Sequence, residues 1–139
     1  MYRKMLVAND GSPGAAKALE SALELAKRLD VPLTMVCVEN LERFPAVVDV
    51  VAEAQRDRTS AFDTVVASAK TLAQAQGVEF EARIVAGHPV PTIVDFVERG
   101  GYDLLVVGYL GHSALYEHLI GSTADRLIAV APCTVTVVK

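Results

Sequence analysis

Short apolar runs alternate along this chain with longer segments whose apolar residues recur at helical spacing. The runs lie at residues 3–9, 31–40, 78–87, 102–107 and 133–138. Each run fits a β-strand, and each intervening segment can supply the crossover that two parallel strands require. The alternation predicts an α/β, Rossmann-like fold: a five-stranded parallel sheet with helices on both faces, in the order β-α-β-α-β-α-β-α-β. A chain of 139 residues fits one domain over 1–139.

The helical segments carry recognisable end signals. Helices are expected at residues 14–30, 50–76, 88–101 and 113–132. Ser12 is suited to cap the first helix, and Pro13 behind it suits the first turn. Gly77 is a typical stop for the second helix. The stretch from Leu41 to Asp49 shows no regular pattern.

Composition and charge narrow the functional classes. Apolar residues make up 52% of the chain, which excludes a disordered protein. No apolar run reaches the roughly 18–20 residues of a membrane span, and the N-terminus lacks a signal peptide, so we expect a cytoplasmic protein without a membrane span. The net charge of −4 argues against binding to nucleic acid.

Familiar catalytic and metal-binding motifs are missing from the sequence. "GHSAL" lacks the second glycine of a nucleophile elbow, no Gly-Lys-Ser/Thr forms a P-loop, and the turn "NDGSPG" does not match a dinucleotide fingerprint. Cys37 and Cys133 lie in β-like runs without metal-ligand spacing, so we interpret both as small core residues. The sequence therefore offers no catalytic residue and no metal site of its own.

Three spaced glycines suggest a ligand site. Gly108 and Gly111 follow the fourth strand, and Gly121 precedes two hydroxyl residues, Ser122 and Thr123. In an open parallel sheet, ligands bind beyond the carboxyl ends of the strands, where the strand order reverses. Glycine lets the backbone approach a ligand closely, and exposed backbone N–H groups attract phosphate. The pattern Gly-x2-Gly-x9-Gly-Ser thus predicts a phosphate-binding region, although glycines also occur simply as connections.

At these motifs the sequence resembles the universal stress protein family, in its nucleotide-binding branch. "MLVANDGSPGAAKALESALELA" is similar to the opening strand, the Asp-centred turn and the first helix of that family. "YDLLVVG" is similar to its fourth strand. "GYLGHSALYEHLIGSTADRLIAVAPCTVTVVK" is similar to its glycine motif and closing strand. The resemblance covers nearly the whole chain and implies a fold of the adenine nucleotide alpha hydrolase type.

The resemblance also implies a ligand and its pose. Family members with the motif bind ATP with a divalent ion, so ATP is expected, with ADP or AMP as alternatives and Mg²⁺ or Mn²⁺ as the metal. The adenosine end would lie on Ala8, Asn9, Asp10 and Val38. The phosphates would lie on Gly108, Gly111, Gly121, Ser122 and Thr123, with His112 as a further contact or a solvated loop residue.

Several points about this site remain open at the level of sequence. No Lys or Arg lies between Gly108 and Gly121, so phosphate charge would be met by N–H groups, by His112 or by a metal ion. Asp10 could be a turn residue, a ligand contact or both. A valine at Gly121 is expected to block the phosphate path and to be incompatible with an unusual φ there. His88 and His118 are interpreted as a loop residue and a structural residue.

Three functions follow as hypotheses. The first is a nucleotide-binding regulatory module for stress response that acts on an unidentified protein partner. The second is a slow ATP hydrolase of the same fold, and the third is a dimeric interaction domain that has lost nucleotide binding. A homodimer is expected through the last strand, "CTVTVVK", because its Thr/Val alternation and single Lys139 leave a sheet edge poorly protected. The competing possibility is that Leu41–Val48 or another loop covers that edge.

Overall fold

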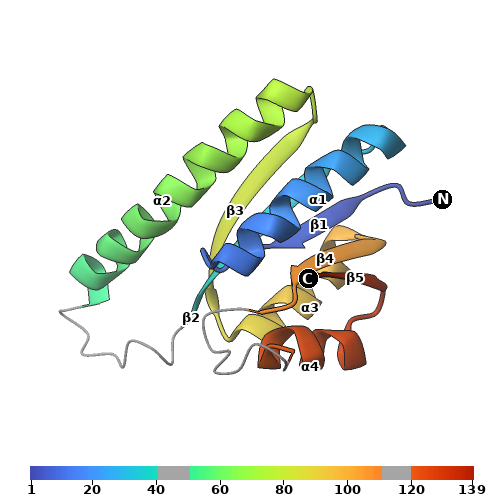
Figure 1. Cartoon of the computed structure of the whole chain (residues 1–139). Coiled ribbons are helices and arrows are strands. Elements are labelled where there is room, and N and C mark those ends of the chain that lie inside the picture. The colour runs from blue at the N-terminus through green and yellow to red at the C-terminus, as the bar shows by residue number, and fades with distance from the viewer. Residues whose placement is uncertain (41–50, 111–119) are drawn as a thin grey trace.

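The computed structural model describes residues 1–40, 51–110 and 120–139, with the side chains of 51–61 left out (Figure 1). Strands and helices alternate along the described chain. Their bounds are β1 Met5–Ala8, α1 Pro13–Leu29, β2 Leu33–Asn40, α2 Val51–Gln76, β3 Phe80–Gly87, α3 Pro89–Gly100, β4 Leu104–Gly108, α4 Ser122–Val130 and β5 Thr134–Val138. The predicted element order is confirmed.

The strands form one parallel five-stranded sheet in the order β3-β2-β1-β4-β5. The short strand β1 is central, with Met5 beside Leu33 of β2 on one side and beside Leu104 of β4 on the other. The sheet edges are β3 and β5, so the prediction that the last strand lies at an edge is confirmed.

Helices cover both faces of the sheet. Figure 1 shows α1 and α2 on one face and α3 and α4 on the other. Each face has its own core, because alternate residues of a strand point to opposite sides. Met5, Val7 and Met35 lie in the core under α1 and α2, whereas Leu6 and Val36 lie in the core over α3 and α4. No helix among the described residues is long and apolar enough to cross a membrane.

Helix α1 begins as the sequence predicts. The Ser12 hydroxyl accepts a hydrogen bond from the Ala15 N–H at 3.1 Å, and Pro13 occupies the first turn. A row of alanines faces the sheet, and Ala18 and Ala22 are fully buried. Small side chains in this row let the helix axis lie close to β1 and β4.

The fourth helix is shorter than predicted. The sequence pattern indicated a helix over 113–132, but α4 spans Ser122–Val130, and Gly121 is its N-cap with φ −60° and ψ 146°. Part of the predicted helix, 113–119, falls outside the described residues, as does the irregular stretch 41–49. The apolar periodicity continued through Ile120 and Gly121 and concealed the true helix start.

The two cysteines differ from each other in burial. Cys37 is fully buried in β2, which confirms its interpretation as a core residue. Cys133 immediately precedes β5 and is half-buried against the core over α3 and α4. The prediction that Cys133 lies within the last strand is therefore wrong by one residue, and its burial is only partial.

The amino-terminal end of the sheet is held by Asp103. Its carboxylate accepts hydrogen bonds from the backbone N–H groups of Arg3 (2.8 Å) and Lys4 (3.1 Å). The Lys4 ammonium donates to the Gly100 carbonyl at 2.6 Å and lies 4.5 Å from the centre of the Tyr102 ring. These contacts join β1 to β4 at the end where strands begin.

Candidate functional site

The strand order reverses between β1 and β4. From β1 the chain passes through α1 to β2 on one side, whereas β4 leads through α4 to β5 on the other side. The loops after β1 and β4 therefore run in opposite directions at the carboxyl end of the sheet. Ligands usually bind between two such loops in folds of this kind. Ala8 is the last residue of β1, and Asn9 and Asp10 follow it, whereas Gly108 is the last residue of β4. Because β1 and β4 are paired, the structure brings these predicted residues to the same end of the sheet.

Asn9 holds the turn between β1 and α1 from inside. Its side chain is buried, its Oδ1 accepts from the Gly11 N–H at 2.8 Å, and its Nδ2 lies 3.4 Å from the Met35 sulfur. Its own N–H donates to the Val36 carbonyl at 2.9 Å. Gly11 has a φ of 83°, which favours glycine. Asn9 thus contributes mainly by fixing the shape of this turn.

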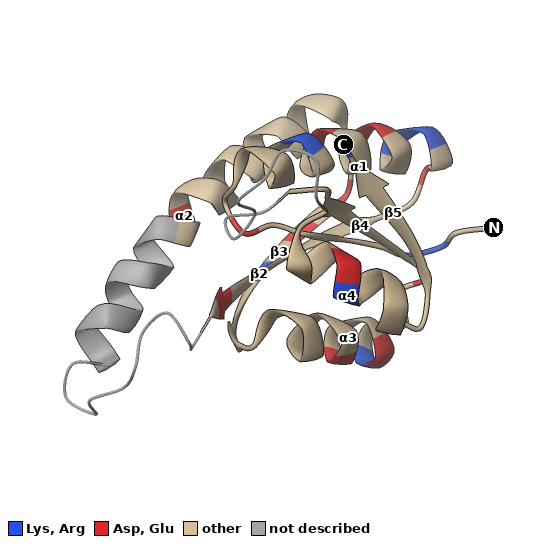
Figure 2. Ribbon diagram, turned by 60° about the horizontal axis from the view of Figure 1, so that its bottom comes forward, with Lys and Arg blue, Asp and Glu red and all other residues tan. Residues whose placement is uncertain are grey.

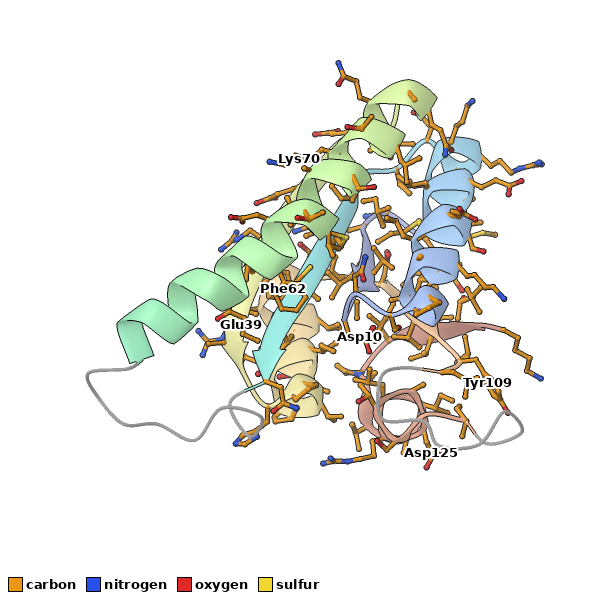
Figure 3. All side chains as sticks on the ribbon, turned by 60° about the vertical axis from the view of Figure 1, so that its left-hand side comes forward. Asp10, Glu39, Phe62, Lys70, Tyr109 and Asp125 are labelled. Carbon is orange, nitrogen blue, oxygen red and sulfur yellow. The ribbon has the colours of Figure 1, made fainter. Side chains whose placement is uncertain are left out.

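Asp10 is exposed at the tip of the same turn. Its Oδ1 accepts from the Ser12 N–H at 2.9 Å, so the predicted role as a turn residue is confirmed. In Figure 3, Asp10 lies between Glu39 and Tyr109, as the strand order β2-β1-β4 requires. Burial raises the pKa of the Cys37 thiol to about 12, and the negative charge of Asp10 adds to the increase.

Ala8 and Val38 lie on the opposite face from Asn9. Both are half-buried, and both pack against the core that α3 and α4 cover. Ile120, just before α4, packs against the same core. The two predicted adenosine contacts therefore share one sheet face with the start of α4, and they expose part of an apolar surface there.

Gly108 makes a close approach to the chain itself. A Cβ placed on Gly108 would lie 2.7 Å from the carbonyl oxygen of Gly14, in the first turn of α1. A Cβ on Gly14 would in turn overlap the carbonyl oxygen of Leu110. The absence of a side chain at Gly108 is thus needed for packing against α1, whatever it contributes to a ligand.

Tyr109 links three elements through its backbone. Its N–H donates to the Val138 carbonyl at 2.8 Å, and its carbonyl accepts from the Gly121 N–H at 2.7 Å. The Lys139 ammonium lies 5.4 Å from the centre of the Tyr109 ring. The sequence reasoning missed Lys139, because this cation is distant in sequence from the glycines and comes near them only through the pairing of β4 with β5.

Gly121 begins α4 in an ordinary backbone conformation. Its φ of −60° and ψ of 146° are accessible to any residue, so the expectation of an unusual φ is wrong. Gly121 is buried, Ser122 is exposed and Thr123 is half-buried. The two hydroxyls lie in the first turn of a nine-residue helix, where backbone N–H groups and the helix dipole favour an anion.

The remaining predicted residues fall into two groups. Gly111, His112 and His118 lie outside the described residues. His88 is exposed and precedes α3 at the end of the edge strand β3, so β2 separates it from the reversal between β1 and β4.

Glu39 is a second residue that the sequence reasoning missed. It lies near the carboxyl end of β2 and is only 6% exposed, although it carries a carboxyl group. In the sequence, Glu39 is a polar residue near the end of a strand, and only its position in the sheet shows that it is buried.

In the described part of the chain, no three His, Cys, Asp or Glu side chains form a group that could hold a metal ion.

Comparison with known proteins identifies the family. The sequence model of the universal stress protein family matches residues 1–139. This chain belongs to the universal stress protein family. A universal stress protein of Methanocaldococcus jannaschii is 31% identical over 144 residues, covering 100% of this chain and 83% of the relative. The family motifs noted in the sequence are thus part of a match over the full chain.

Solved structures of family members share the fold. The universal stress protein UspA of Lactobacillus plantarum superposes with a TM-score of 0.92 at 25% identity, covering 99% of this chain and 98% of that one. A universal stress protein in complex with cAMP has a TM-score of 0.73 at 25% identity, with 99% and 96% coverage. An Arabidopsis thaliana member with AMP bound is 21% identical and has a TM-score of 0.72. The match covers 99% of this chain and 91% of that one, and it supports the fold. Some universal stress proteins thus bind adenine nucleotides.

Proposed function

We propose that this universal stress protein is a nucleotide-binding regulatory module whose ligand is ATP, with ADP and AMP as alternatives. The observation that carries the proposal is the position of α4. Tyr109 ties Gly121 to the end of β4 by a 2.7 Å hydrogen bond, which sets the first turn of α4 beside the reversal in strand order. The relatives with cAMP and AMP bound lend support.

The described residues suit the two ends of such a ligand. The half-buried Ala8 and Val38 offer an apolar surface to an adenine base, and Asp10 is exposed beside them for polar contacts with the ribose. Ser122 and Thr123 offer hydroxyls and a helix N-terminus to phosphate.

Phosphate charge needs a positive counterpart. Lys139 is the cation that the structure brings to Tyr109, beside Gly108. A Mg²⁺ or Mn²⁺ ion would be held largely by phosphate oxygens and water, because Mg²⁺ commonly binds through phosphates and one or two carboxylates. Asp10 is a carboxylate at this end of the sheet. Gly111 and His112 are proposed as further contacts on the basis of sequence.

A calorimetric titration with ATP, ADP and AMP, each with and without Mg²⁺, tests the proposal. We expect saturable binding of at least one nucleotide, and nucleotide detected by mass spectrometry in the protein as purified would agree with this. If none of the three binds at millimolar concentration, the interaction domain without nucleotide binding becomes the better account.

We further propose that the protein is a binding module with at most slow ATP hydrolysis. Phosphoryl transfer depends on charge stabilisation and a positioned nucleophile. Asp10 is already engaged with the Ser12 N–H, and Lys139 lies over an aromatic ring. Release of phosphate should therefore stay far below the roughly 1–10³ per second of ordinary enzymes. A rate in that range that disappears in Asp10→Asn would support the hydrolase instead.

We also propose a cytoplasmic homodimer that pairs two copies of β5. Thr134–Val138 contains no charged residue and forms a sheet edge, and the β5 arrow in Figure 2 accordingly carries neither of the charge colours. The opposite edge strand, β3, carries the Glu81–Arg83 ion pair. Charged side chains protect an edge against pairing. The exposed Ile128 and Val130 of α4 add apolar surface near β5. The two cysteines form no disulfide, which fits a reducing compartment.

Replacing Val137 by proline tests the dimer. Because the Val138 carbonyl points toward β4, and N–H and C=O of one strand residue share a side, the N–H of Val137 points to the open edge. Val137→Pro should therefore weaken pairing between copies and leave the β4–β5 ladder intact. Sedimentation at micromolar concentration should give a dimer for the parent and a monomer for the variant. A parent that sediments as a monomer near 15 kDa would contradict the dimer.

A further inference from the structure

The backbone of the first turn of α1 lies against the backbone at the end of β4 and just after it. A Cβ on Gly14 would overlap the Leu110 carbonyl oxygen, and its next neighbour would be the Leu110 carbonyl carbon at 3.2 Å. A Cβ on Gly108 would lie 2.7 Å and 2.8 Å from the carbonyl oxygen and carbon of Gly14. The atoms nearest to a side chain at either glycine are thus backbone atoms, which cannot move aside as the end of a flexible side chain can.

The same short segment is held from the other side of the sheet. Tyr109 lies between Gly108 and Leu110, and its carbonyl accepts the Gly121 N–H at 2.7 Å. Gly121 is the N-cap of α4, which covers the face opposite α1. Residues 108–110 therefore connect the first turn of α1 with the first turn of α4 around the end of β4.

We infer that Gly14 is a positioning residue for the phosphate end of the nucleotide site. It makes no contact with a ligand in this role, and it acts through Leu110 and Tyr109 on the position of Gly121 and α4. The effect of Gly14 on nucleotide binding rests on the proposed function. The structural coupling between Gly14 and Gly121 rests only on the contacts of Gly14 with Leu110 and of Tyr109 with Gly121.

The expected effect of a side chain at position 14 is directional. In Gly14→Ala the methyl group and the Leu110 carbonyl cannot occupy the same space, so the segment after β4 must move outward from α1. Tyr109 moves with Leu110, and the hydrogen bond to Gly121 passes the displacement to the start of α4. Ala8 and Val38 are not part of this path. Contacts to phosphate should weaken, and contacts to adenosine should persist.

Gly100 provides a matched control at the other end of the sheet. It is also a helical glycine, the last residue of α3, and a Cβ there would overlap the Tyr102 ring. Gly100→Ala therefore introduces the same methyl group against a side-chain ring in place of backbone, without touching residues 108–110. If Gly14→Ala does not fold, Gly108→Ala addresses the same contact from β4 with a milder clash, and it is used only in the measurement without ligand, because Gly108 is itself a predicted phosphate contact.

The first measurement uses the protein without ligand. Backbone amide shifts from ¹H–¹⁵N NMR should change at Tyr109, Gly121 and Ser122 in Gly14→Ala and stay unchanged there in Gly100→Ala. Changes confined to α1 and its preceding turn would overturn the inference, whether or not the protein binds any nucleotide.

The second measurement is calorimetric titration with adenosine, AMP and ATP. Gly14→Ala should lower the affinity for ATP by about tenfold or more, relative to a change of less than about twofold for adenosine. Equal losses for both ligands would mean that Gly14 only supports the fold and would overturn the inference. If the parent binds none of the three ligands, the proposed function fails, and the NMR result still decides the coupling.

Discussion

The two ends of the sheet are closed by different kinds of contact. At the amino-terminal end, the contacts are made by charged side chains. The Asp103 carboxylate accepts hydrogen bonds from two backbone N–H groups, and the Lys4 ammonium donates to a carbonyl and lies over an aromatic ring. At the carboxyl-terminal end, backbone meets backbone: Gly14 lies against Leu110, and Tyr109 bonds to Val138 and Gly121.

This difference separates stability from ligand binding. The side-chain contacts at the amino-terminal end satisfy polar groups where β1 and β4 begin. The backbone contacts at the carboxyl-terminal end hold together the segments where we propose that the nucleotide binds. Substitutions at the amino-terminal end should therefore lower stability and leave ATP binding unchanged, whereas substitutions at the carboxyl-terminal end should weaken ATP binding and leave the fold intact.

The largest expected effect is the loss of binding in Gly121→Val. The φ and ψ of Gly121 are accessible to any residue, so backbone strain should not unfold the variant, but a branched side chain would stand at the buried start of α4, where we propose that the phosphates bind. We expect no measurable heat of ATP binding in calorimetry and a cooperative thermal transition near that of the parent.

Ala129→Val is the matched control, because it places the same side chain at an exposed position near the far end of α4. It should bind ATP like the parent. Undiminished ATP binding by Gly121→Val would show that the phosphates bind elsewhere.

The reverse outcome is expected for Asp103→Ala. Loss of two hydrogen bonds from backbone N–H groups to a half-exposed carboxylate should lower the free energy of unfolding by about 1–2 kcal/mol in urea titrations. ATP affinity should not change. Asp95→Ala, which removes only an exposed ion pair with Arg99, should cost less than about 0.5 kcal/mol.

The stabilisation from Asp103 should also depend on pH. Partial burial tends to raise the pKa of this carboxyl, but the N–H groups of Arg3 and Lys4 outweigh it and hold the pKa below its ordinary 3.8. The contribution is therefore complete above pH 3.8 and is lost as the pH falls through the lower folded value. Between about pH 5 and 2, the parent should lose more stability than Asp103→Asn. Parallel losses would assign the acid sensitivity to other groups.

The smallest expected effect is that of Asp10 on its neighbour Cys37. The pKa of this thiol is about 12, with burial as the larger cause and the Asp10 charge as the smaller one. Asp10→Asn should therefore lower the pKa of Cys37 by less than about one unit. A pH titration of the ¹³Cβ shift of Cys37 by NMR measures this, with the half-buried Cys133 as the internal reference. An unchanged pKa would remove Asp10 from the surroundings of Cys37.

The sequence predicted those parts of the fold that depend on local pattern. Apolar periodicity located the nine elements of the described residues, and Ser12 with Pro13 marked the start of α1, because these signals act over a few residues. The start of α4 at Ser122 was missed, since the apolar pattern runs through Gly121 unbroken.

Long-range contacts account for what the sequence could not provide. Lys139 meets Tyr109 only because β5 pairs with β4, and the burial of Glu39 depends on the packing of its neighbours in the sheet. Gly14 gave no signal at all, because its partner Leu110 lies almost one hundred residues further along the chain. The β1–α1 turn was predicted correctly because its signals are local, whereas phosphate binding by the Gly-Ser motif stays a prediction.

The placement of two tyrosines gives the protein built-in optical reporters. The chain has no tryptophan, so tyrosine emission is not lost by energy transfer to an indole. Tyr102 is buried beside Phe96 and Lys4, whereas Tyr109 lies half-exposed under the Lys139 ammonium at the other end of β4. The chain has four tyrosines, so comparing Tyr102→Phe and Tyr109→Phe each with the parent would give, by difference, the fluorescence from each end of the same strand without any added dye.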